Sequence, residues 1–254
     1  MKRCACVMFF FLSMVTVISA QSLVIYTEND PPSQFLDKDG KLTGYMIEVV
    51  QEIQKRVGNT DKVELVPWAR GYDAIQKQNN VVLFSMTRTA ERNPMFKWVG
   101  PTLESTSNLY AKADSKIKIA GMEEAKKLGK IGVYRDDVRD QILSKAGFTN
   151  LDRENDVTTN IKMLMGGRID VYADSSTSFA ANVKAAGFKS EDFKFILTFQ
   201  KSQLFFAMSL KMPDSVVTAW NAALDTMKKD GTFEKMLKKY YPDNQLPGPA
   251  ITAF

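Results

Sequence analysis

The sequence contains no histidine, and its two cysteines, Cys4 and Cys6, both lie near the start. The lack of histidine removes the commonest general base and the commonest metal ligand. Catalysis by a serine–histidine pair is therefore excluded, as is most zinc chemistry. Because both cysteines lie within the first twenty residues, the rest of the chain can form neither a disulfide nor a thiolate site.

Long apolar runs are also scarce, and the one that stands out lies at the start of the chain. Lys2 and Arg3 precede an apolar run over residues 7–18, and the small residue Ala20 follows it. This order is typical of a secretory signal peptide, and the run is too short for a good membrane span. We therefore expect residues 1–20 to be a cleaved signal peptide and the mature protein to be soluble.

Charges of both signs are present and well mixed along the chain. The sequence has 34 basic and 29 acidic residues, and its formal net charge of +5 falls to +3 without the expected signal peptide. No basic tract of the kind that binds nucleic acid is found. We therefore expect no nucleic-acid partner.

The first part of the mature chain alternates between strand and helix patterns. β-Branched and apolar runs bounded by polar residues, proline or glycine predict strands over 22–26, 62–68 and 81–84. Apolar spacing of three and four predicts helices over 44–57, before a glycine C-cap at Gly58, and over 69–78. This alternation is typical of a parallel α/β sheet with helices on both faces.

The pattern then restarts in a second, smaller unit. Its predicted strands cover 109–112, 130–134 and 169–173. Its predicted helices cover 121–127, 136–145 and 157–167. The chain continues with a strand over 204–210 and with helices over 216–229 and 232–241. Two α/β units are therefore expected.

Polar residues follow three of the predicted strands, where a parallel sheet binds its ligands. Strand 81–84 runs into Ser85 and Thr87, and then into Thr89 and Arg92. This order predicts that a helix starts at Thr89. The free backbone N–H groups of a helix start can bind an anion, and Arg92 could bind a carboxylate through two parallel hydrogen bonds. The alternative is that Thr89 merely caps a helix and the arginine is solvated.

Several motifs, in this order, resemble the extracellular solute-binding proteins of the polar amino-acid type, the receptor components of ABC importers. They are Pro31-Pro32, Gly44-Tyr45-Met46-Ile47-Glu48, Thr87-Arg88-Thr89-Ala90-Glu91-Arg92, Gly167-Arg168-Ile169-Asp170 and Asp230-Gly231-Thr232-Phe233. The resemblance spans the mature chain and is greatest to a divergent branch that has Pro67-Trp68-Ala69-Arg70, Phe96-Lys97-Trp98-Val99-Gly100-Pro101 and Arg135-Asp136-Asp137.

The resemblance implies a fold of two α/β lobes, each a mostly parallel sheet flanked by helices. Two hinge strands would join the lobes, which would close on a ligand between them. Lobe one would comprise residues 22–108 and 206–254, and lobe two residues 109–205.

The resemblance also implies roles for residues of lobe one. Arg92 would grip the α-carboxylate of the ligand, and Thr87 and Ser85 would offer backbone groups or hydroxyls. Glu28 would lie beside the ligand's amino group.

Lobe two departs from the family pattern. The family usually places an ammonium-binding aspartate five residues after the position of Asp170, where this chain has Ser175, and Asp174 comes one residue too early. One residue along a strand turns a side chain to the other face, so Asp174 would serve only if the strand has ended or bulged. The usual Gly-Thr at the first helix start is Asp136-Asp137 here, which caps a helix well but binds an anion poorly. A carboxylate ligand is favoured, and an α-amino acid is left open.

Four further residues are candidates with an alternative role. Tyr26 and Trp68 would form aromatic walls of the site, or Trp68 would pack against lobe one. Arg70 and Arg135 would add cationic contacts, or would form salt bridges with Glu28, Asp136 or Asp137.

Together these observations predict a periplasmic receptor, monomeric and without cofactor or metal, that passes a small carboxylate-bearing ligand to a membrane ABC permease. Paired carboxylates can do acid–base chemistry, so an enzyme resembling cyclohexadienyl dehydratases is one alternative. No nucleophile with a base beside it is found, so we expect no enzyme. A sensory module that reports the bound state to a membrane receptor is a second alternative.

Overall fold

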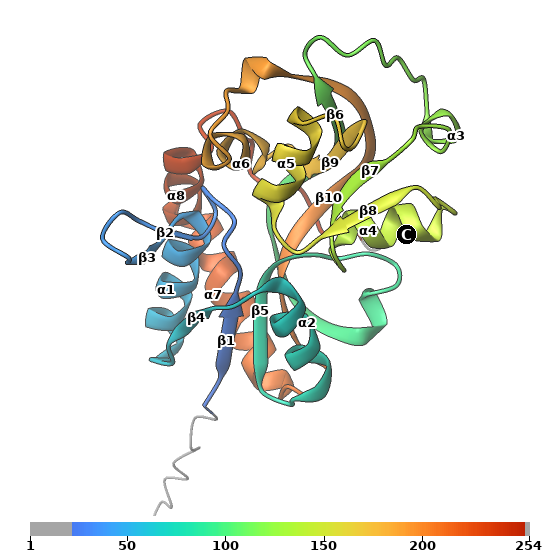
Figure 1. Cartoon of the computed structure of the whole chain (residues 1–254). Coiled ribbons are helices and arrows are strands. Elements are labelled where there is room, and N and C mark those ends of the chain that lie inside the picture. The colour runs from blue at the N-terminus through green and yellow to red at the C-terminus, as the bar shows by residue number, and fades with distance from the viewer. Residues whose placement is uncertain (1–21, 252–254) are drawn as a thin grey trace, which may run out of the picture.

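The computed structural model describes residues 22–251 (Figure 1). The expected signal peptide, residues 1–20, therefore lies outside the described residues. Within residues 22–251, none of the helices has both the length and the apolar character needed to cross a membrane.

The first lobe is built on a mostly parallel sheet. Strand β1 (Val24–Thr27) lies between its parallel neighbours β4 (Val63–Leu65) and β5 (Val81–Thr87), and β5 pairs antiparallel with the end of β10 (Phe193–Ser209). Helices α1 (Tyr45–Val57), α2 (Trp68–Lys77), α7 (Asp214–Lys229) and α8 (Thr232–Tyr240) and the small hairpin β2 (Phe35–Leu36) and β3 (Leu42–Thr43) complete the lobe.

Helices bury both faces of this sheet. Ile25 points into a core shared with α1, α7 and α8, whereas the next residue, Tyr26, points into a second core shared with α2. Val82 and Phe84 likewise face the first core, and Leu83, between them, faces the second. A strand covered on both faces needs apolar side chains at nearly every position, which is why β1 and β5 are near-continuous apolar runs.

The second lobe repeats the plan on a smaller scale. Its parallel strands are β7 (Ile131–Tyr134), with β8 (Leu151–Glu154) on one side and β9 (Val171–Ser175) on the other. Its helices are α3 (Met122–Ala125), α4 (Val138–Lys145), α5 (Val157–Met165) and α6 (Phe179–Ala185), and a short 3₁₀ helix, η2 (Ser190–Asp192), precedes β10. Strand β8 and helix α6 were not predicted.

Two long antiparallel strands join the lobes (Figure 1). Strands β6 (Phe96–Lys112) and β10 are each 17 residues long, and they pair from one lobe into the other. On β6, Leu103 packs into the core beneath α1, and Leu109 packs into the core of the second lobe. The architecture is therefore the predicted pair of α/β lobes joined by two strands.

The local structure around Arg92 differs from the prediction. Thr89 does not begin an α-helix, because a single turn, closed by the bond from Asn93 N to Thr89 O, leads into the 3₁₀ helix η1 (Asn93–Met95). Pro94 has no N–H to continue an α-helix, and the chain then enters β6. Arg92 thus lies on a tight turn between two strands.

The strand predicted over 62–68 is shorter than expected. It ends at Leu65, and Trp68 is the first residue of α2. Pro67 is the N-cap of that helix and keeps an extended backbone, with φ −56° and ψ 141°, so helical geometry begins at Trp68. The ring of Trp68 is therefore positioned by a helix and not by a strand end.

Candidate functional site

A cavity of about 60 Å³ lies between the two lobes. Its walls are formed by the residues at and after the carboxyl ends of β1, β5, β7 and β9, together with the first turn of α4 and the middle of β6 and β10. In the sheets of α/β proteins, ligands bind in this position. The cavity is therefore the candidate ligand site.

Eight of the twelve residues predicted from the sequence line this cavity: Glu28, Trp68, Ser85, Thr87, Arg92, Asp137, Asp174 and Ser175. They come from both lobes and from five separate segments of the chain.

The other four lie elsewhere. Tyr26 is buried in the core beneath α2, and Arg70 is exposed on that helix. Arg135 is exposed and donates hydrogen bonds to Asn155 and to the carbonyl of Arg153. Within residues 22–251 neither arginine forms a salt bridge, so the pairing weighed for them is absent as well.

Asp136 contributes its backbone in place of its side chain. Its carboxyl group is exposed, but its carbonyl oxygen accepts a hydrogen bond from Trp68 Nε1 at 3.1 Å. Its φ of +59° is unusual for a residue other than glycine and turns the chain from β7 into α4. The predicted contact with the ligand is therefore replaced by a contact between the lobes.

Arg92 is a buried cation that faces the cavity. Its side chain is held by Nη1, which donates to Thr87 O at 3.3 Å, and by Nε, which donates to Gln141 Oε1 at 3.2 Å. Its guanidinium carbon lies 5.4 Å from the ring centre of Trp68 and 5.1 Å from that of Tyr72. Burial lowers the pKa of Arg92.

No carboxylate of the described residues lies within 4 Å of Arg92, and its Nη2 atom has no hydrogen-bond partner among them. Only 1% of this residue is exposed to solvent. A buried charge is costly unless it is paired. The guanidinium is therefore poised to receive an anion from the cavity.

Ser85 and Thr87 reach the cavity together because side chains two residues apart lie on the same face of a strand. The pairing of β5 with β10 shifts at Ser85, which is an extra residue between the paired positions Phe84 and Met86. Its φ of +61° and the hydrogen bond from its hydroxyl to Gln34 Oε1, 2.8 Å long, fix this bulge. Such bulges re-aim side chains near functional sites.

Glu28 and Asp30 place two acidic side chains on the wall formed by lobe one. Burial, reinforced by the nearby carboxylates of Asp30 and Asp137, raises the pKa of Glu28 to about 8. Burial also raises the pKa of Asp30 to about 6. Neither carboxylate has a lysine or arginine of residues 22–251 within 4 Å. Both are thus carboxylates that lack a cationic partner.

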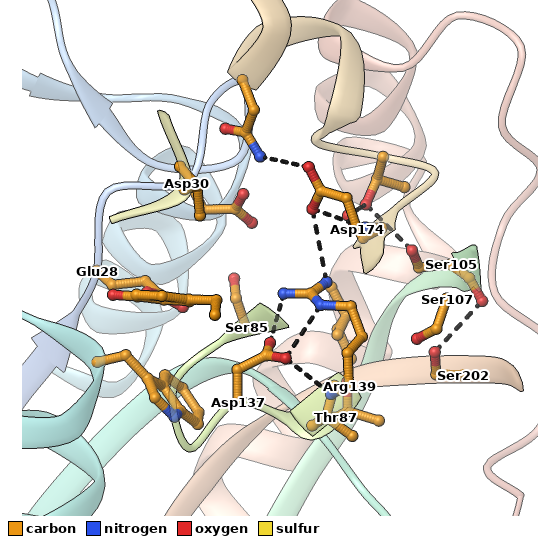
Figure 2. Close-up of a pocket in the computed structure, with 18 of the residues that line it drawn as sticks. Glu28, Asp30, Ser85, Thr87, Ser105, Ser107, Asp137, Arg139, Asp174 and Ser202 are labelled. Atoms are coloured by element: carbon orange, nitrogen blue, oxygen red, sulfur yellow. Dashed lines mark hydrogen bonds and ion pairs between the residues drawn. The ribbon is translucent and has the colours of Figure 1, made fainter. Parts of the chain in front are cut away.

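Lobe two presents an ion-paired group of three residues. Asp137 caps α4 and accepts from Arg139 N at 2.7 Å, and its side chain pairs with the Arg139 guanidinium through Nε and Nη2. The Nη1 atom of Arg139 lies 3.8 Å from Asp174 Oδ1, and Asp174 Oδ2 accepts from Asn182 Nδ2 at 3.0 Å. Figure 2 shows the guanidinium between the two carboxylates.

The charges in this group of three residues change one another's pKa values. Burial raises the pKa of Asp174, whereas the charge of Arg139 opposes that rise. Burial lowers the pKa of Arg139, but Asp137 and Asp174 raise it by more, so that the net shift is upward. Arg139 is therefore a permanent cation inside the cavity wall.

Asp174 and Ser175 both reach the cavity. Strand β9 ends at Ser175, so the alternation of faces that would separate the two residues stops there. The hydroxyl of Ser175 accepts from the backbone N of Ser178, and Ser175 N donates to Asp174 Oδ1 at 2.7 Å. The early aspartate is thus not turned away from the site.

The sequence did not reveal several residues that line the cavity. Ser105 and Ser107 lie two apart on a stretch of β6 that was not predicted as a strand. Asp30 follows Glu28 by two residues, and Arg139 follows the helix cap Asp137 by two. That spacing was the available signal. No group of three or more acidic, histidine or cysteine side chains in residues 22–251 is arranged to hold a metal ion.

The two lobes are in contact across the cavity. Arg92 of lobe one donates to Gln141 on α4, and Trp68 donates to the carbonyl just before that helix. Outside the cavity, Lys145 on α4 forms an ion pair with Glu91. This is the closed arrangement of a two-lobed molecule.

Comparison with known proteins identifies the family of the chain. The family model of the bacterial extracellular solute-binding proteins, family 3, matches residues 23–243. The probable histidine-binding protein of Neisseria gonorrhoeae is 24% identical over 83% of this chain and 79% of that protein. The L-cystine-binding protein TcyJ of Escherichia coli K12 is 26% identical over 83% of this chain and 79% of that protein.

Solved structures match over most of the chain. A histidine kinase sensor domain with similarity to periplasmic binding proteins superposes with a TM-score of 0.81 at 19% identity, over 89% of this chain and 98% of that one. An ancestral arginine-binding protein bound to arginine superposes with a TM-score of 0.75 at 25% identity, over 87% of this chain and 98% of that one. Because the family model covers nearly the whole described chain, the protein belongs to the bacterial extracellular solute-binding proteins, family 3.

Proposed function

We propose that this protein is an exported receptor that captures a small carboxylate-bearing ligand, an amino acid or a related compound, and delivers it to a membrane ABC permease. The observation that carries the proposal is the buried guanidinium of Arg92, which faces the cavity without an anionic partner among the described residues. A ligand carboxylate would supply the missing charge and hydrogen bonds.

Ser85 and Thr87 complete the carboxylate subsite. Both lie beside Arg92 at the end of β5 and line the same cavity. The rings of Trp68 and Tyr72 stack on each other, and the guanidinium lies beside this stacked pair. A planar cation in this position is suited to binding a carboxylate by two parallel hydrogen bonds.

Charge complementarity favours a zwitterion. Among residues 22–251, Arg92 is a cation of the cavity wall without an anionic partner, and Glu28 and Asp30 are carboxyl groups of that wall without a cationic partner. A ligand with one carboxylate and one ammonium group would match both. The matched relatives have names that state binding to histidine, cystine and arginine, and none of these names describes an enzyme.

Closure is the mechanism that we propose for capture. The ligand binds lobe one through Arg92, and α4 of lobe two then adds its contacts by a hinge motion along β6 and β10. The cavity of about 60 Å³ holds only a few water-sized groups, so a larger ligand would keep the lobes further apart. The ligand shifts the lobes only by its differential affinity for the closed state.

Export to the periplasm is part of the same proposal. The family is extracellular, which agrees with the expected signal peptide at residues 1–20. We propose that the closed lobes dock on the permease and that the protein acts as a monomer.

A thermal-shift screen of the mature protein tests this proposal. The panel contains amino acids, dicarboxylates, aromatic acids and polyamines, and a ligand raises the melting temperature by mass action. Arg92→Ala should abolish the shift. Arg168→Ala makes the same chemical change at an exposed position outside the cavity and should retain it. Equal shifts in the two variants would refute the role of Arg92.

A further inference from the structure

Arg139 occupies an unusual place for a charged side chain. It comes from the first turn of α4, yet only 14% of its side chain is exposed, and it lines the cavity. Its guanidinium contacts Asp137 and Asp174, which are 9% and 2% exposed. All three residues belong to lobe two, so their pairing does not depend on closure.

The carboxylates of lobe two are therefore already compensated. Asp137 has its two oxygens on Arg139, and Asp174 has one oxygen near Arg139 and the other on Asn182. A cation that took the place of Arg139 between these carboxylates would leave the Arg139 guanidinium unpaired in a low-dielectric site. A ligand ammonium that displaced Arg139 would have to overcome this cost.

The carboxylates of lobe one are in the opposite situation. Glu28 and Asp30 face the same cavity from the other side, without a cationic partner among residues 22–251 (Figure 2). A ligand cation placed there favours the ionised form of both carboxyl groups, whose pKa values burial raises, and breaks no existing ion pair.

We propose that Arg139 determines the ligand's orientation and charge class: it is a built-in counter-ion that fills the cation position between Asp137 and Asp174, so the ligand's cationic group is received by Glu28 and Asp30 of lobe one. This inference rests on the proposed function, because it assumes that a ligand enters the cavity. It assigns one cationic subsite to lobe one and none to lobe two. The ligand class is accordingly a compact zwitterion whose two charges both bind lobe one.

The counter-ion role can be tested without knowing the ligand. Arg139→Ala removes the atoms of one N-ethylguanidinium ion, so this ion should bind in the space that the variant leaves. We expect it to raise the melting temperature of Arg139→Ala saturably, by several degrees more than it does for the wild type. N-ethylurea, which has nearly the same shape and no charge, should have no such effect.

Arg139→Lys is the second variant, for the case that Arg139→Ala does not fold. Because it keeps the charge, its melting temperature should lie between those of the wild type and Arg139→Ala. Equal effects of N-ethylguanidinium and N-ethylurea on Arg139→Ala would overturn the counter-ion role. So would a melting temperature of Arg139→Ala equal to that of the wild type.

The position of the ligand cation is tested with two pairs of probes that differ by one ammonium group: L-alanine with propanoate, and L-arginine with 5-guanidinopentanoate. The preference for the amino acid, measured by calorimetry, should fall about tenfold in Glu28→Gln, the equivalent of losing one charge-assisted contact. It should fall less in Asp174→Asn. The double variant Glu28→Gln/Arg139→Ala should regain a preference, because Asp174 then becomes free.

A larger loss in Asp174→Asn than in Glu28→Gln would place the ligand cation on lobe two and overturn the inference, while leaving capture by Arg92 intact. If none of the four probes binds the wild type, that result counts against the proposed function for these ligands. The N-ethylguanidinium measurement then still decides the role of Arg139, so the two failures are distinguishable.

Discussion

Replacing Glu28 by glutamine should remove a pH dependence from the stability of the ligand-free protein. Burial, together with the nearby charges of Asp30 and Asp137, raises the pKa of Glu28 from 4.5 to about 8, although Arg139 and a hydrogen bond with Tyr134 act against that rise. The folded state thus binds this proton more tightly than the unfolded state does. The contribution of this bound proton to the free energy of unfolding is full below pH 4.5 and is lost progressively as the pH rises to about 8.

The size of this loss follows from the same two values. A rise of the pKa from 4.5 to about 8 corresponds to roughly 5 kcal/mol of folding free energy between pH 4.5 and pH 8. This is an upper bound, because Glu28 is in contact with the cavity and because opening of the lobes would rehydrate it. A third of this value would still change the melting temperature by about 3–7 °C in a protein of this size.

Thermal unfolding between pH 5 and pH 9 measures the effect. The wild type should lose stability relative to Glu28→Gln as the pH rises, and the two curves should meet near pH 5. Asp30, with its pKa of about 6, titrates in both proteins, and because its charge raises the pKa of Glu28, the difference between the two curves reports the coupled pair. Glu64→Gln makes the same change at an exposed position of β4 and should run parallel to the wild type. If Glu28→Gln also runs parallel, the carboxylate is not desolvated in the folded protein.

Two further predictions concern the contacts between the lobes. Trp68→Phe keeps a ring beside Arg92 but loses the hydrogen bond to Asp136 O, so ligand affinity measured by calorimetry should fall about fivefold, the equivalent of one neutral hydrogen bond. A fall of more than a hundredfold would mean that the indole has another role. Lys145→Ala removes the ion pair with Glu91, whose side chains are 70% and 48% exposed, so affinity should change by less than about fivefold and the change should fade in high salt. A large effect that persists in high salt would contradict this.

The parts of the fold that the sequence predicted are those with a local signal. Helix α1 shows apolar residues at helical spacing and ends at Gly58, which has a φ of +72°. Strand β5 is a near-continuous apolar run because both of its faces are buried. The sequence predicted that the segment containing Arg92 lies at the site, because it directly follows β5. The helix expected there does not form, since Pro94 cannot continue it.

The parts that were missed have no such signal. Strand β8 has the sequence Leu-Asp-Arg-Glu, is half-buried throughout and lacks an apolar run, so only its pairing with β7 makes it a strand. Much of β6 and β10 alternates with polar residues where the chain passes between the lobes. Arg139 resembles any charged residue of a helix first turn until the fold brings Asp174 beside it. Tertiary contacts decide these features, and spacing alone does not.

The central claim, that Arg92 receives the carboxylate of a ligand held between the lobes, is tested most directly by calorimetric titration of the wild type and of Arg92→Met with the ligand that gives the largest thermal shift. Truncating one partner of a buried, hydrogen-bonded charge pair costs roughly 2–5 kcal/mol, a loss of about 30-fold to several thousandfold in affinity. We expect a loss in this range, with Arg168→Met binding as the wild type does. Full affinity in Arg92→Met would contradict the account.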